Sequence, residues 1–122
     1  MRILITGRRA DVRSALGNFL RNKLDLDEVV EAANIQTMLT QSESTQPDII
    51  LLDWDSCDRP LEDLIPALHM LESRPGVVLI NETYKTKKAA LDAGVDAVVL
   101  RGDPPKSLLI AIESVRLERE GN

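Results

Sequence analysis

The chain has very few aromatic residues. Phe19, Trp54 and Tyr84 make up 2% of its 122 residues, so a hydrophobic core must be built from aliphatic side chains. Stacking platforms for the bases of single-stranded nucleic acid are therefore not expected. The net charge is −5, whereas a general nucleic-acid binder normally presents a basic face. Together these two features predict that nucleic acid is not a partner.

Cysteine and histidine are equally scarce. Cys57 is the single cysteine and His69 the single histidine, which excludes an internal disulfide and a cysteine-based zinc site. No apolar run approaches the roughly 18–20 residues that span a bilayer. The N-terminus has no apolar stretch ending in a cleavage signal. We therefore predict one cytoplasmic domain over residues 1–122, without a membrane partner.

Apolar runs of strand length alternate with segments of helical period. The expected strands lie at residues 3–5, 29–30, 49–52, 77–80 and 98–100. The expected helices centre on residues 12–20, 35–39, 64–71, 89–93 and 108–115. Five consecutive strand–helix units predict a doubly wound, flavodoxin-like α/β fold. Its parallel sheet should have the strand order 2-1-3-4-5, with helices on both faces.

Some element ends can also be predicted. The polar stretch 40–46 should close the second helix. Pro66 should lie in the first turn of the third helix, with Asp63 as its N-terminal cap. Gly94 should terminate the fourth helix. Residues 117–122 are predicted to form a charged, fraying tail.

The predicted topology also predicts where a site would lie. In an open doubly wound sheet, ligands bind beyond the carboxyl ends of the strands, where the winding reverses between strands 1 and 3. Asp53 follows strand 3 and lies at the centre of this region. The positions around it are Gly7 and Arg8 after strand 1, Asn81 after strand 4 and Arg101 after strand 5.

Three segments carry a resemblance to a known family. Residues 47–54 (PDIILLDW), residues 93–100 (AGVDAVVL), and residues 2–5 (RILI) followed by 10–13 (ADVR) resemble the receiver domains of bacterial two-component response regulators. The resemblance covers nearly the whole chain. It implies that Asp53 stands at the phosphoacceptor position. It also implies a protein partner, either a histidine kinase or a downstream effector.

The chain departs from this family around Asp53. Receivers place two acidic residues for Mg²⁺ after strand 1, where this chain has Gly7 and Arg8. They place Ser or Thr after strand 4 and Lys after strand 5, where this chain has Asn81 and Arg101. Because Mg²⁺ prefers carboxylate oxygens and Arg8 carries a permanent positive charge, we expect no bound Mg²⁺ or other cofactor. We also expect no enzymatic activity, and an ion pair of Asp53 with Arg8 or Arg101.

The leading hypothesis is a degenerate receiver that signals through protein contacts without Mg²⁺-dependent phosphorylation. One alternative is a receiver that is phosphorylated on Asp53. Another is a Rossmann-like nucleotide-binding domain, because residues 4–7 resemble the first strand and turn of that fold. Arg8 could attract phosphate there, although the further glycines of that turn are missing.

The last predicted helix carries two apolar residues outside its core stripe. Ile110 and Leu117 are seven residues apart and so share one side of the helix. Receivers commonly associate through this part of the fold. We therefore predict a weak homodimer through this face.

Overall fold

The computed structural model describes residues 1–81 and 87–120. Each of the five predicted strands and five predicted helices is present, together with one short 3-10 helix. In chain order they are β1 (Arg2–Thr6), α1 (Ala10–Lys23), β2 (Glu28–Ala32), α2 (Ile35–Thr45), β3 (Ile49–Asp53), η1 (Trp54–Ser56), α3 (Leu61–His69), β4 (Gly76–Asn81), α4 (Lys87–Asp92), β5 (Ala97–Leu100) and α5 (Pro105–Glu120).

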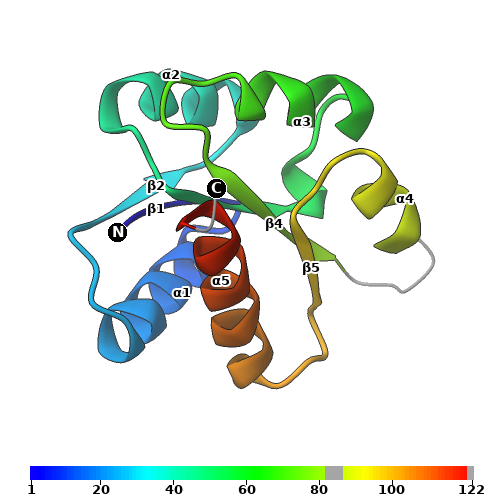
Figure 1. Ribbon diagram of the computed structural model, residues 1–122. Coiled ribbons are helices and arrows are strands. Elements are labelled where there is room, and N and C mark those ends of the chain that lie inside the picture. Colours follow the sequence, from blue (N-terminus) through cyan, green and yellow to red (C-terminus); the bar gives the residue numbers. More distant parts are fainter. Residues whose placement is uncertain (82–86, 121–122) are drawn as a thin grey trace.

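The strands form one parallel sheet in the order β2-β1-β3-β4-β5, which confirms the predicted topology. Helices α1 and α5 cover one face of the sheet, and α2 and α3 cover the other (Figure 1). Alternate side chains of a strand point to opposite faces. Leu4 accordingly packs in the core beneath α2 and α3, whereas Ile3 and Ile5 pack in the core beneath α1 and α5. Both faces are thus dry and aliphatic, as the composition predicts.

The predicted end of α2 is wrong, because the polar stretch continues the helix to Thr45. Its hydroxyl groups bond within the helix: Ser42 Oγ donates to Met38 O at 2.7 Å, and Thr45 Oγ1 donates to Gln41 O at 2.7 Å. Ser and Thr hydroxyl groups often bond to nearby backbone groups in ways that disfavour a helix. In α2 they instead bond to carbonyls one turn earlier in the helix. Gln46, with a φ of 52°, then ends the helix in the left-handed conformation.

The predicted start of α3 is also wrong. The helix begins at Leu61 with Pro60 as its N-cap, so Pro66 lies inside it and Asp63 is not the cap. A proline in a helix interior costs about 3 kcal/mol. Four buried side chains along one face of this helix offset that cost: Leu61, Leu64, Ile65 and Leu68.

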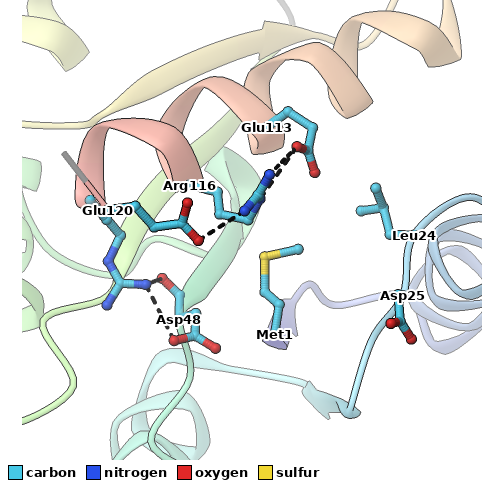
Figure 2. A pocket seen from close by; sticks show the side chains of 8 residues that line it. Met1, Leu24, Asp25, Asp48, Glu113, Arg116 and Glu120 are labelled. Carbon is cyan, nitrogen blue, oxygen red and sulfur yellow. Dashed lines mark hydrogen bonds and ion pairs between the residues drawn. The ribbon is translucent and has the colours of Figure 1, made fainter.

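The predicted tail at 117–122 is wrong for its first four residues, because α5 continues to Glu120. Arg119 anchors this end: its guanidinium donates to Asp48 O at 2.7 Å and to Ser73 O at 2.6 Å. Arg116 pairs with Glu113 and Glu120 on the same helix, close to Met1 (Figure 2). Residues 121–122 lie outside the described residues.

Gly94 follows α4 with a φ of 105°, as predicted for a residue that terminates a helix. Within residues 1–81 and 87–120, the structure contains no helix with the length and apolar character needed to cross a membrane.

Candidate functional site

Asp53 lies at the carboxyl end of β3, directly after four fully buried residues. Its side chain is 17% exposed. Oδ1 accepts a hydrogen bond from the backbone N–H of Asp55 at 3.2 Å, which caps η1. The apolar strand and this cap together place the carboxylate at the switch point of the sheet, where the topology predicted it.

Arg101, which follows β5, reaches this carboxylate. Its Nη2 lies 2.5 Å from Asp53 Oδ1 and 3.1 Å from Asp55 Oδ2, so one guanidinium pairs with two acidic side chains. The backbone N–H of Arg101 donates to the carbonyl of Asn81 at 2.9 Å, which ties the arginine to the end of β4. Asn81 itself is buried. Hydrogen bonds between ionised partners are shorter and stronger than neutral ones, so these contacts hold Asp53 and Arg101 together.

Gly7 lies on the other side of Asp53. A Cβ added at Gly7 would lie 3.7 Å from Asp53 Oδ2, an ordinary van der Waals contact. The carbonyl of Gly7 accepts a hydrogen bond from Arg13 Nη1 at 2.6 Å, and Arg13 also pairs with Glu31 at 3.1 Å. The loop after β1 is therefore held by a side chain from α1.

Arg8 is exposed and makes no hydrogen bond or ion pair with any residue in the described part of the chain. Of the two arginines predicted to pair with Asp53, Arg101 therefore makes the contact and Arg8 does not. The difference follows from position. Arg8 belongs to a short connection that leads away into α1, whereas Arg101 lies at the end of β5 with its backbone bonded to β4.

Sequence reasoning did not predict the contacts that two members of this site make. Asp55 shares the guanidinium of Arg101, and Arg13 holds the loop at Gly7. The spacing of Asp53 and Asp55 was the available signal for the first. No sequence signal marked Arg13, because its partners come from the loop after β1 and from β2.

Cys57 lies close to Asp53, with Sγ 3.9 Å from the carbonyl oxygen of that residue. Burial, followed by the negative charges of Asp53, Asp58 and Asp55, raises the pKa of the Cys57 thiol to about 11. The thiol therefore stays protonated at neutral pH.

The side chains at the switch point are a poor match to a Mg²⁺ site. Mg²⁺ requires near-octahedral oxygen coordination. Gly7 supplies no ligand, and the guanidinium of Arg101 engages both Asp53 and Asp55. Among residues 1–81 and 87–120 there is no cluster of three or more His, Cys, Asp or Glu side chains suited to a metal ion.

The two apolar residues predicted to lie outside the core stripe of the last helix are indeed exposed. Ile110 is 58% exposed and Leu117 is 57% exposed on α5. They lie on the side of α5 away from its buried residues Leu108, Ile112 and Val115.

Comparison with known proteins places this fold in a class. No protein-family model matches the chain. The KDP operon transcriptional regulatory protein KdpE of Escherichia coli is 35% identical in an alignment of 85 residues that covers 67% of this chain and 38% of KdpE. The matched part thus spans less than half the length of that curated relative.

Solved structures of receiver domains share the fold. A CheY-like response regulator receiver domain protein of Methanospirillum hungatei superimposes with a TM-score of 0.81 at 23% identity, covering 98% of this chain and 96% of that one. A LuxR-family two-component response regulator from an Aurantimonas species gives a TM-score of 0.84 at 18% identity, covering 96% and 85%.

The sheet order and the structural similarity define a CheY-like, flavodoxin-type fold. The chain belongs to the receiver domains of response regulators, the signal-receiving modules of two-component systems.

Proposed function

We propose that this domain is a degenerate receiver that signals through protein–protein contacts and is not phosphorylated in a Mg²⁺-dependent reaction. The observation that supports this most strongly is the ion pair between Arg101 and Asp53. It joins the phosphoacceptor-equivalent carboxylate to a cation supplied by the chain itself.

Charge explains why this arrangement opposes phosphorylation. Phosphoryl transfer needs a divalent cation to neutralise the negative charge that develops on the phosphoryl oxygens. Arg101 brings a permanent positive charge against Asp53 Oδ1, and Gly7 leaves no carboxylate on the opposite side. An incoming Mg²⁺ would be repelled by the guanidinium. It would also have to displace hydrogen bonds that Asp53 and Asp55 already make.

Phosphorylation on Asp53 is the alternative outcome of the test. Its carboxylate is 17% exposed, so it is not sealed from a phosphodonor. The family assignment argues against a Rossmann-like nucleotide-binding function, which depended on the resemblance of residues 4–7 and on the charge of Arg8. We propose no enzymatic activity for the domain.

Trp54, the residue after Asp53, is 38% exposed and provides the assay. Mg²⁺ with beryllofluoride, a phosphate analogue, should leave its fluorescence unchanged. A variant with Gly7→Asp, Arg8→Asp and Arg101→Lys should gain a response, because it restores the residue types that receivers place after strands 1 and 5, and a Cβ at Gly7 meets only ordinary contacts. Saturable quenching of the unaltered protein by millimolar Mg²⁺, abolished by Asp53→Asn, would show that the domain is a functional phosphoreceiver.

The proposed output is a protein contact, with a histidine kinase or a downstream effector as the partner and with no nucleic-acid or membrane partner for this domain. The cytoplasmic location expected from the sequence is part of this proposal. The relationship to KdpE, a regulatory protein of the same family, supports the proposed location and the proposed protein partner.

We further propose that Ile110 and Leu117 form the contact of a weak homodimer. Their support is exposure of more than half of each residue on one side of α5. Light scattering at high protein concentration should show a mass above the monomer, and Ile110→Glu should lower it to the monomer. Met70→Glu is the matched control, because Met70 is 84% exposed at the end of α3 on the other face of the sheet. A monomer at every concentration would refute the proposal.

A further inference from the structure

A large cavity lies on the α1–α5 face of the molecule. Its volume is about 800 Å³, within the range of about 300–1,000 Å³ typical of small-molecule sites. It shares Asp53, Asp55 and Arg101 with the site described above but extends well beyond them. Most of its wall is apolar and comes from α1, β5 and the start of α5: Val12, Leu16, Phe19, Val99, Pro104 and Leu108.

The apolar wall is accessible. Val12, Leu16 and Phe19 are only partly buried, although α1 packs its inner side against the sheet. Val99 and Leu108, which lie deeper, are 8% and 6% exposed. Apolar surface of this kind gains about 25 cal/mol per Å² when a ligand removes it from water. The cavity can therefore bind an apolar molecular body.

One polar atom in the wall lacks a partner. Thr6 is 2% exposed, and its Oγ1 has no hydrogen-bond partner in the described part of the chain. A buried hydroxyl without a partner destabilises a fold, so such groups are normally satisfied. Thr6 lines the cavity, which allows a polar ligand atom to supply the missing hydrogen bond.

The four arginines around the cavity differ in whether they are paired. Three of its four arginines pair with carboxylates: Arg9 with Asp11, Arg13 with Glu31, and Arg101 with Asp53 and Asp55. Arg8 is the fourth, and it has no ion pair with any described residue. The cavity therefore combines apolar walls with one uncommitted positive charge at its rim.

We propose that this cavity binds an amphipathic organic anion. Its apolar body lies between α1 and α5, its anionic group pairs with Arg8, and a polar atom reaches Thr6 Oγ1. Such a ligand would bridge the two helices beside the Arg101 network, and so would provide an input that requires no phosphorylation of Asp53. This goes beyond the proposed function.

Octanoate is a suitable probe, and octanol is its matched uncharged analogue. Titration of the full chain, followed by calorimetry and by amide NMR, should show one saturable octanoate site with shifts concentrated on α1, β5 and α5. Octanol should bind more weakly. Inorganic phosphate, which offers charge without an apolar body, should show no saturable binding.

Three variants test the assignment of roles. Arg8→Gln should weaken octanoate binding on the order of fivefold, as expected for one partly exposed ion pair, and leave octanol binding unchanged. Arg9→Gln is the control, because this substitution removes the same charge from a side chain that is already paired with Asp11. Val12→Phe should weaken both probes by filling the cavity.

The proposal is overturned if octanoate shows no saturable binding, or if octanoate and octanol bind equally. It is also overturned if Arg8→Gln and Arg9→Gln have the same effect, or if Val12→Phe has none. Because Arg8→Gln changes only an exposed side chain, its result does not depend on whether Val12→Phe folds. The Mg²⁺ assay on Trp54 is independent of all these readouts, so failure here leaves the proposed function standing.

Discussion

A double-mutant cycle between Asp53 and Arg101 measures how strongly the altered site is held together. Two charges about 4 Å apart attract by about 4 kcal/mol at an effective dielectric constant near 20. Asp53 is 17% exposed, but Arg101 is 37% exposed, so solvent screening and desolvation remove most of that attraction. We therefore expect a coupling free energy of about 1 kcal/mol.

The single variants should differ in a definite direction. Arg101→Gln removes the charge that pairs with both Asp53 and Asp55, and leaves two carboxylates close together. Asp53→Asn leaves Arg101 paired with Asp55 and so should be less destabilising. In the Asp53→Asn background, Arg101→Gln should lower the free energy of unfolding by less than it does in the unaltered protein.

Urea unfolding at neutral pH, followed by circular dichroism, gives the four free energies of the cycle. Raising the salt concentration should reduce the coupling because the pair is partly exposed. A parallel cycle between Asp53 and Arg8 is the control and should give zero, since Arg8 makes no ion pair with the described residues. A zero coupling for Arg101, or equal couplings for both arginines, would refute the locked-site explanation.

Further predictions concern glycine packing and the single thiol. Gly76→Ala should lower the free energy of unfolding by about 1–3 kcal/mol, because its Cβ would come within 2.2 Å of the buried Val115 Cγ1. Gly17→Ala in α1 should raise the free energy of unfolding by about 0.5–1 kcal/mol, since its Cβ meets only ordinary contacts. Urea unfolding of both variants checks that the two changes have opposite signs. At pH 8, Cys57 should react with iodoacetamide on the order of a hundredfold more slowly than a free thiol, because its pKa is raised to about 11. The folded state holds this proton more tightly than the unfolded state. The free energy of unfolding of the unaltered protein, minus that of Cys57→Ala, should therefore be constant below about pH 8.5 and should fall as the pH rises toward 11.

The fold could be predicted because its signals are local and repeated. Apolar runs such as residues 49–52 favour strands buried on both faces, and five of them alternating with helical segments favour a doubly wound sheet. The helix ends were harder to predict, because they depend on tertiary contacts. Pro66 lies inside α3 since the buried face of that helix outweighs the proline, and Arg119 keeps α5 helical through bonds to distant carbonyls.

The candidate site could be predicted only in part. Topology places Asp53, Gly7, Asn81 and Arg101 at one edge of the sheet, because the carboxyl ends of parallel strands meet there. Which arginine reaches Asp53 could not be predicted, since Arg8 and Arg101 carry the same charge. Only the backbone path after each strand distinguishes them. The cavity between α1 and α5 was equally hidden, because it depends on how two helices far apart in sequence pack on one face.

The position of Arg101 also limits how this receiver could switch. In the structure its guanidinium joins the end of β5 to the acidic residues after β3, and its backbone is bonded to Asn81 at the end of β4. A ligand can shift a conformational equilibrium only by binding two states with different affinity. Arg101 is tied to three strand ends and also lines the cavity between α1 and α5. An amphipathic anion paired with Arg8 would lie beside this guanidinium, and it could favour one arrangement of the Arg101 contacts over another. A shift of this kind would change the contacts of β5 with no change in the covalent state of Asp53.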